Sequence, residues 1–250
     1  MLEVNKIYCG DCLEIMPQID DKKIDMILCD MPYGRTACRW DRVISLDKLW
    51  KQYKRIIKDS GAIILTASQP FTTDLINSNR QWFKYELVWN KKIAGNVGLA
   101  NKMPLKIHEN ILVFYKKQST YNPQFHNNYT EMIGKFTETN SESINLSSKI
   151  KKLSGQRGFP RTILEYMRPN NMTGGGLHPT QKPVALFEYL IKTYTNEDEL
   201  VLDNCIGSGT TAVACLNTNR NFIGMDIEQK CVDIANKRLA NTYYQTELIR

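Results

Sequence analysis

The sequence predicts an α/β protein built on a doubly wound, mostly parallel β-sheet. Short apolar runs alternate with amphipathic stretches over the first ninety residues, and the same alternation returns after residue 178. Several of these runs end in an acid or in a glycine-rich turn, as buried parallel strands do at their carboxyl ends. With 250 residues, 42% of them hydrophobic, the chain can also bury a sizeable core.

The elements of the N-terminal third follow from apolar patterning. Lys23–Asp30 (KIDMILCD) is a short apolar run typical of a buried strand. Ser45 begins a helical pattern, which Ser60-Gly61 is expected to end. Two further strands are predicted at 62–66 and 85–89, with a helix between them from Pro70 to about Ser78.

Residues 90–177 have a different character. One strand is predicted at 110–115 (NILVFY), but no periodicity persists between Gln118 and Asn171. A long irregular stretch inside a compact domain is typical of a functional insertion. After it, we expect a helix at 183–194, a strand at 200–203, a helix at 209–217, a strand at 222–226 and a last helix at 228–240.

The net charge of +7 is carried by the middle of the chain. The segment Lys91–Arg168 holds 13 of the 33 Lys and Arg residues but only five of the 26 Asp and Glu residues, a local net charge of +8. The remainder has a net charge of −1. A basic block confined to one segment indicates contact with a polyanion such as nucleic acid.

The seven cysteines are scattered and odd in number, unlike a disulfide scaffold. Cys9 and Cys12 form a C-x-x-C, but no second pair or nearby histidine completes a metal site, so we expect buried thiols and no bound metal. No apolar run approaches transmembrane length, and the N-terminus lacks the features of a signal peptide. We therefore expect a cytoplasmic protein.

One loop predicts a nucleoside cofactor. In VLDNCIGSGTTAVAC, residues 201–215, a strand ends at Asp203, and Gly207-Ser208-Gly209 then turns tightly into a helix. Glycines let the backbone approach a ligand, and the helix N-terminus offers free N–H groups. Asp226, 19 residues after Gly207, ends the next strand, where an acid can bind ribose hydroxyls. By spacing alone, the loop also fits NAD.

A second loop indicates chemistry on an amino group. Asp30-Met31-Pro32-Tyr33 directly follows a predicted strand, although on its own it could be a plain turn. The amino nitrogen of a base is a poor nucleophile because its lone pair is delocalised into the ring. A carboxylate and a main-chain carbonyl that accept its two hydrogens would localise that pair. An aromatic ring beside them can stack on a base taken out of the duplex.

Three motifs occur in the order found in β-class DNA amino-methyltransferases: DMPYG at 30–34, HPTQKP at 178–183 and DNCIGSGTT at 203–211. The chain resembles this group over essentially its whole length apart from the central segment. The resemblance implies a permuted Rossmann-like methyltransferase fold with its cofactor loop C-terminal. It also implies transfer of a methyl group from S-adenosylmethionine to adenine N6 in double-stranded DNA, directly and in line, onto a flipped base.

The resemblance also assigns roles to residues. Asp30 and the carbonyl of Met31 bind the target amino group, Pro32 stiffens the turn, and Tyr33 stacks on the flipped base. The expected cofactor-binding residues are Asp11, Cys12, Asp30, His178, Thr180, Lys182, Asp203, Cys205, Ile206, Gly207, Ser208, Gly209, Thr210, Thr211, Asp226 and Ile227.

By the same resemblance, residues 118–172 are an inserted target-recognition region between a catalytic half, 1–117, and a cofactor-binding half, 173–250. The expected DNA-binding residues are Lys149, Lys151, Lys152, Arg157 and Arg161. The chain has no recognisable endonuclease motif. We therefore expect a solitary enzyme or one partnered by a separately encoded restriction endonuclease, as a monomer or a homodimer.

Two departures from the family pattern stand out. Asn204-Cys205 replaces the usual Pro-Phe after the acid, so an aromatic wall is lost and we expect weaker cofactor binding. Met31 replaces the first proline of the DPPY motif, but its main-chain carbonyl remains as an acceptor.

Three other interpretations remain open. Cytosine N4 offers the same kind of amino group, and Asp rather than Ser at position 30 favours adenine by family tendency. An NAD-dependent oxidoreductase is favoured only by the glycine loop. A non-catalytic DNA-binding module would not need Asp30, Tyr33, Gly207 and Gly209 intact. Cytosine C5 methylation is disfavoured because its nucleophilic cysteine occurs within Pro-Cys, a dipeptide absent from this sequence.

Overall fold

The computed structural model describes residues 2–34, 43–125, 158–169 and 181–247. The chain divides into two compact units, one formed by residues 1–122 and 162–250 and the other by 123–161. In the described part of the second unit, the rings of Phe125 and Phe159 contact each other with centroids 5.2 Å apart.

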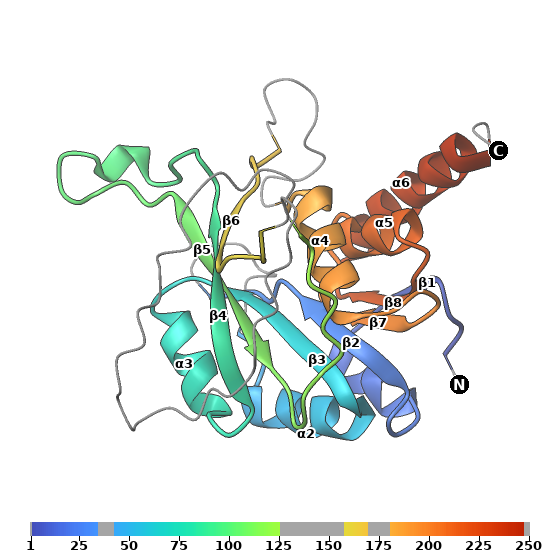
Figure 1. The fold of residues 1–250 in the computed structure, drawn as a ribbon. Helices are drawn as coiled ribbons and strands as arrows, with labels where there is room; N and C mark the ends of the chain where they lie inside the picture. The colour runs from blue at the N-terminus through green and yellow to red at the C-terminus, as the bar shows by residue number, and fades with distance from the viewer. Residues whose placement is uncertain (1, 35–42, 126–157, 170–180, 248–250) are drawn as a thin grey trace. The chain divides into compact units, whose positions relative to one another are not determined.

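The first unit contains an eight-stranded sheet (Figure 1). Among these strands β5 alone is antiparallel to its neighbours, so the prediction of a mostly parallel sheet is confirmed. In spatial order the strands are β1 (Lys6–Cys9), β8 (Asn221–Asp226), β7 (Leu200–Asp203), β2 (Ile24–Cys29), β3 (Ile57–Ala67), β5 (His108–Phe114), β4 (Phe83–Asn90) and β6 (Ile163–Glu165).

Helices cover both faces of the sheet because successive strand side chains point to opposite sides. Met26 and Leu28 of β2 pack into one core, and Ile27 and Cys29 into the other. The first core includes α4 (Val184–Tyr194), α5 (Thr210–Asn217) and α6 (Gln229–Glu247). The second includes α1 (Cys12–Ile15), η1 (Met16–Gln18), α2 (Leu46–Ile56) and α3 (Phe71–Ser78).

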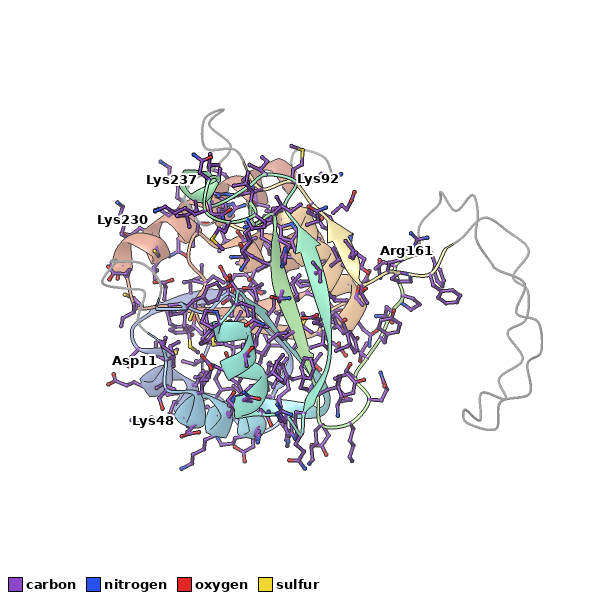
Figure 2. The ribbon with its side chains drawn as sticks, turned by 90° about the vertical axis from the view of Figure 1, so that its left-hand side faces the viewer. Asp11, Lys48, Lys92, Arg161, Lys230 and Lys237 are labelled. Atoms are coloured by element: carbon purple, nitrogen blue, oxygen red, sulfur yellow. The ribbon has the colours of Figure 1, made fainter. Side chains whose placement is uncertain are left out.

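Charged side chains such as Lys48, Lys230 and Lys237 point outward from these helices (Figure 2). Lys92, also exposed, lies beyond the carboxyl end of β4, just before the short helix η2 (Val97–Leu99). Among the described residues, no helix combines the length and apolarity that crossing a membrane requires.

The predicted end of the helix that begins after Ser45 is wrong. The helix α2 ends at Ile56, and the chain passes directly into β3 at Ile57, so Ser60-Gly61 lies inside a strand. A Cβ at Gly61 would lie 2.7 Å from the carbonyl oxygen of Asp25 and 2.8 Å from the Ile57 side chain. This glycine therefore permits the close approach of β2 to β3 rather than capping a helix.

Several short elements were not predicted, among them β1, α1 and β6. The strand β1 pairs with β8, the helix α1 follows it, and β6 pairs with β4 inside the segment that lacked periodicity. Because β5 runs against its neighbours, its first residues lie at the edge where the parallel strands end. That edge receives the loops after β1, β2, β7 and β8 together with the start of β5.

Replacing Gly61 by alanine should destabilise the fold. The added methyl group would meet backbone at 2.7 Å, and forcing such a group into a packed core costs about 1–3 kcal/mol. Urea denaturation of the wild type and the variant measures the difference in the free energy of unfolding.

Gly98→Ala is the matched control, because a Cβ at Gly98 would meet no atom within 4 Å. Its free energy of unfolding should stay within about 0.5 kcal/mol of the wild type. Equal denaturation midpoints for the two variants would contradict the explanation given for Gly61.

Candidate active site

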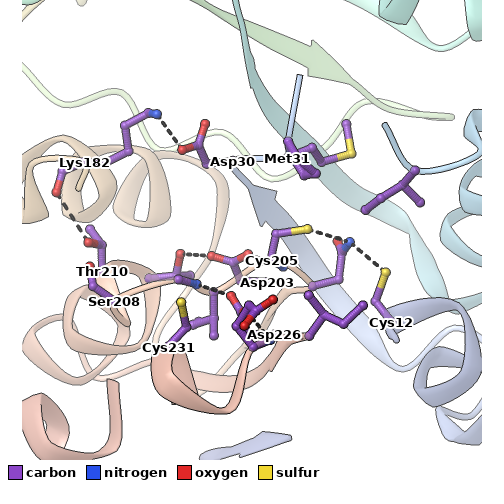
Figure 3. A pocket seen from close by; sticks show the side chains of 18 of the residues that line it. Cys12, Asp30, Met31, Lys182, Asp203, Cys205, Ser208, Thr210, Asp226 and Cys231 are labelled. Atoms are coloured by element: carbon purple, nitrogen blue, oxygen red, sulfur yellow. Dashed lines mark hydrogen bonds and ion pairs between the residues drawn. The ribbon is translucent and has the colours of Figure 1, made fainter. Parts of the chain in front are cut away.

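A cavity of about 690 Å³ opens at the carboxyl edge of the sheet. Its wall combines the loop after β2, the glycine loop after β7, the end of β8 and the segment before α4 (Figure 3). Ligands of doubly wound proteins bind at this edge. The structure therefore brings together, around one cavity, the two loops that the sequence analysis singled out.

The glycine loop is shaped by its backbone. Gly207 and Gly209 have φ values of +51° and +82°, in the left-handed region that favours glycine. A Cβ at Gly209 would also lie 2.9 Å from that of Ala235 in α6, whereas a Cβ at Gly207 would meet nothing within 4 Å. Gly209 thus allows the loop to pack on α6, and Gly207 leaves open space on the cavity wall.

The two acids at the ends of β7 and β8 hold this loop in its conformation through hydrogen bonds. Asp203 is buried and accepts hydrogen bonds from the Cys205 N–H, at 3.0 Å, and from the Thr211 hydroxyl. Asp226 accepts the Gly207 N–H on Oδ2 and the Glu228 N–H on Oδ1, both at 2.9 Å. A carboxylate oxygen can accept more than one hydrogen bond, so Asp226 can also accept one from a ligand hydroxyl.

The N-terminal Gly-Asp-Cys turn lies against the same cavity. Asp11 caps α1 by accepting the Leu13 N–H at 2.8 Å. Burial raises the pKa of the Cys12 thiol to about 12, so this cysteine is not a nucleophile at neutral pH. Its position on the wall offers a van der Waals surface rather than a reactive group.

Asn204, noted in the sequence only as a departure from the family pattern, joins two parts of the wall. Its Oδ1 accepts a 2.5 Å hydrogen bond from the Tyr53 hydroxyl of α2. Its Nδ2 donates to the sulfur atoms of Cys12 and Cys205, each at 3.5 Å. A buried polar network therefore occupies the place where the family commonly has an aromatic wall.

Asp30 contacts three side chains of the site. Its Oδ2 lies 2.5 Å from the Lys182 Nζ. Its Oδ1 accepts a 2.9 Å hydrogen bond from the Tyr33 hydroxyl and another from the Thr66 hydroxyl, at the end of β3. Burial raises the pKa of Tyr33 well above its usual value, so its hydroxyl stays protonated and donates.

Tyr33 has a second contact besides its hydroxyl. Its ring packs on Phe71 of α3 with centroids 5.4 Å apart and an interplanar angle of 31°. The side chain is only half-buried and lines the cavity. Its proposed role as a stacking platform is thus joined by one that the sequence did not suggest, the orientation of the Asp30 carboxylate.

Lys182 faces a second carboxylate. Its Nζ lies 3.4 Å from Glu109 Oε2, while Glu109 Oε1 lies 3.1 Å from the Lys91 Nζ. Burial alone would raise the pKa of Glu109, but the two ammonium groups outweigh it and hold that pKa below its usual value. Burial would lower the pKa of Lys182, but Asp30 and Glu109 outweigh it and keep that pKa raised. The charged forms of Glu109 and Lys182 therefore persist together.

Sequence reasoning missed Thr66, Glu109 and Lys91. Glu109 directly precedes the predicted strand at 110–115. The only signal in the sequence was an acid at the start of a strand. Such an acid reaches the cavity at the carboxyl edge of the sheet only if its strand runs antiparallel to the others.

The cavity collects most of the expected residues. Gly209 is absent from its lining but shapes the turn. His178, Thr180, Lys149, Lys151, Lys152 and Arg157 lie outside the described residues, and Arg161 belongs to the second unit. The expected residues that line the cavity are Asp11, Cys12, Asp30, Met31, Pro32, Tyr33, Lys182, Asp203, Cys205, Ile206, Gly207, Ser208, Thr210, Thr211, Asp226 and Ile227.

Residues 24–237 match the DNA methylase family N6_N4_Mtase, and the chain belongs to this family. The type II methyltransferase M1.MboII of Moraxella bovis is 28% identical over 94% of this chain and 96% of its own length. The type II methyltransferase M.HpaI of Haemophilus parainfluenzae is 25% identical over 95% of this chain and 75% of its own length.

Solved structures share the fold. The M1.HpyAVI–SAM complex superposes with a TM-score of 0.62 and 24% identity, covering 93% of this chain and 98% of its own. The cytosine-N4-specific PvuII DNA methyltransferase has a TM-score of 0.65 and 15% identity, covering 96% and 91%. The predicted S-adenosylmethionine-dependent DNA amino-methyltransferase is confirmed, and the oxidoreductase interpretation falls away.

The buried acid Asp203 should make stability depend on pH. Burial raises its pKa to about 7 in the folded protein, against about 3.9 in an unfolded chain. The folded state therefore binds more protons between these values, and this contribution to stability is lost as the pH rises through about 7. The free energy of unfolding should fall by up to about 1.4 kcal/mol per pH unit in this window.

Asp203→Asn serves as the matched variant because its amide can still accept the Cys205 N–H and face Thr211. Urea denaturation of both proteins from pH 4 to pH 8 measures the difference. The wild type should lose stability relative to the variant as the pH rises. Parallel pH profiles would refute the raised pKa of Asp203.

Proposed function

We propose that this protein methylates adenine N6 at a specific site in double-stranded DNA, as a methyltransferase of the restriction–modification kind. The observation that carries the proposal is a single cavity lined by Asp30, Tyr33 and the glycine loop with its acid, Asp226. An amino-holding carboxylate thus lies beside a pocket suited to a nucleoside cofactor. Aspartate rather than serine at position 30 favours adenine over cytosine, by family tendency.

The cavity suits S-adenosylmethionine, which supplies a methyl group on a sulfonium when bound. The open space beside Gly207 allows a ligand to approach the backbone, and the Asp226 carboxylate lines the same cavity, where an acid can bind ribose hydroxyls. The residues that would hold the methionine end are those from Cys205 to Thr211. Asn204 and its thiol partners replace the usual aromatic wall with a polar one.

The remaining chemistry is positioning. The Asp30 carboxylate and the Met31 carbonyl would accept the two hydrogens of the target amino group and localise its lone pair. The amino nitrogen then forms its bond to the methyl carbon as the sulfur–methyl bond breaks. The nitrogen carries the transferred positive charge until it loses one hydrogen as a proton. Placement and electrostatics account for the rate, and no covalent enzyme intermediate is required.

Nucleoside analysis tests the proposal. The full chain is incubated with unmethylated genomic DNA and labelled S-adenosylmethionine, and the DNA is digested and separated. Label in N6-methyl-2′-deoxyadenosine, with methylation at one sequence context in methylation-sensitive sequencing, supports the proposal. Label in N4-methyl-2′-deoxycytidine would establish the cytosine alternative, for which the same site offers the same acceptors. No incorporation beside tight DNA binding would indicate a non-catalytic DNA-binding module.

Asp30 and Asp226 should give opposite kinetic effects when replaced by alanine. Loss of Asp30 removes the amino acceptor, so kcat should fall by at least about a hundredfold while the Kd for S-adenosylmethionine changes little. Loss of Asp226 should raise the apparent KM for the cofactor more than it lowers kcat. Steady-state kinetics and calorimetry separate the two, and a reversal of the pattern would show that the residues were assigned to the wrong ligands.

We further propose that the inserted region 118–172, hereafter the central segment, binds DNA phosphates through its basic residues. Replacing Lys149, Lys151 and Lys152 together by glutamine should weaken binding to all sequences alike. Each lost phosphate contact removes about 0.9 from the slope of log K against log salt concentration, so the slope should become shallower by up to about three units. Fluorescence anisotropy over a range of salt concentrations provides the measurement.

The control removes three lysines around Asp59, at the edge of the sheet away from the cavity. These are Lys22, Lys116 and Lys117, which lie 3.0, 3.2 and 3.5 Å from that carboxylate. Their replacement should leave the salt slope unchanged. An equal change in the salt slope for both triple variants would show that the lysines of the central segment act only as general surface charge.

A further inference from the structure

The arrangement around Asp30 poses a problem for the proposed reaction. Its Oδ1 already accepts two hydroxyl hydrogen bonds, and its Oδ2 lies 2.5 Å from the Lys182 ammonium. A carboxylate neutralised in this way is a weak acceptor for amino hydrogens. The ammonium would also repel the positive charge that methyl transfer places on the amino nitrogen. Lys182 must therefore leave Asp30 before the target base can use it.

Glu109 offers a place for that ammonium to go. Its Oε2 is a buried atom that accepts no hydrogen bond, and it lies 3.4 Å from the Lys182 Nζ. Its other oxygen is held by Lys91. The side chains of Lys182 and Glu109 are only 9% and 17% exposed, so a charge that leaves Asp30 cannot simply pass into water.

The balance of charge permits the transfer. Asp30 and Glu109 carry two negative charges, and Lys182 and Lys91 carry two positive charges. Moving the Lys182 ammonium from Asp30 to Glu109 keeps every charge in the cluster and leaves the ammonium paired with a carboxylate. It leaves one free anion, on the carboxylate that the amino group needs.

We propose that Glu109 is a positioning residue that takes Lys182 over from Asp30 when the target base enters, and so frees Asp30 to accept the amino hydrogens. The inference rests on the function proposed above. Lys91 keeps Glu109 in place for the transfer, and the short distances mean that rotation of the lysine side chain is enough. Neither Glu109 nor its link to Lys182 was suggested by the sequence.

A double-variant cycle tests this role. Glu109→Gln removes the charge that attracts the ammonium, so Lys182 stays on Asp30. At saturating DNA and cofactor, the single-turnover rate should fall about tenfold or more, with less than about a twofold change in the Kd for S-adenosylmethionine. In a Lys182→Met background no ammonium blocks Asp30, so the same Glu109→Gln change should alter the rate by less than about twofold.

An equal loss in both backgrounds would overturn the proposal, because Glu109 would then act independently of Lys182. Glu109→Asp keeps the charge and should recover part of the rate. Glu165→Gln is the control: Glu165 pairs with Lys92 at 2.8 Å on the surface, 55% exposed, and its loss should leave the rate unchanged.

Binding gives a second readout that does not depend on turnover. Duplexes carry either adenine or purine, which lacks the exocyclic amino group, at the target position. The wild type should prefer adenine by about tenfold, as expected for a hydrogen bond to a charged acceptor. Glu109→Gln should bind the two duplexes equally, because Asp30 stays blocked.

The two proposals fail in different ways. A wild type that neither methylates adenine nor distinguishes it from purine would remove the proposed function. If the wild type methylates adenine and prefers it to purine, and the Glu109→Gln variant keeps the same preference and the same single-turnover rate, only the role assigned to Glu109 is removed.

Discussion

The active site depends on one interaction, the ion pair between the buried ammonium of Lys182 and the Asp30 carboxylate. The ammonium lies 2.5 Å from Asp30, a residue 152 positions earlier in the chain. An ammonium with so little solvent around it needs carboxylate partners, because an unpaired buried charge is strongly unfavourable. The segment before α4 is therefore tied to the loop after β2. This ion pair helps to bring two loops to the same cavity: the glycine loop, which follows α4 in the sequence, and the loop after β2 that contains Asp30.

Four acids that lie at this edge of the sheet have different roles. Asp203 and Asp226 accept hydrogen bonds from residues of the glycine loop and so fix its shape. Asp30 and Glu109 instead face an ammonium across the cavity wall. The first pair makes the pocket rigid, whereas the second holds a charge that can be rearranged when a substrate enters.

The Asn204-Cys205 departure shows how a missing family feature can be replaced. The sequence comparison alone suggests a lost aromatic wall and weaker cofactor binding. In the structure Asn204 links α2 through Tyr53 and the N-terminal turn through Cys12. The side-chain amide can do this because it accepts on one atom and donates on the other. The wall is therefore held by a polar network instead of by ring packing.

The sequence by itself determined the alternation of strands and helices, the glycine turn and the placement of Asp30 and Asp226 at strand ends. Apolar periodicity and the special backbone angles of glycine act over a few residues, so they can be read locally. Ser60-Gly61 misled for the same reason: a local helix-ending signal could not reveal that Gly61 packs against the backbone of Asp25. Only the tertiary structure decided that Glu109 reaches Lys182, because that contact depends on the strand order and on β5 running antiparallel.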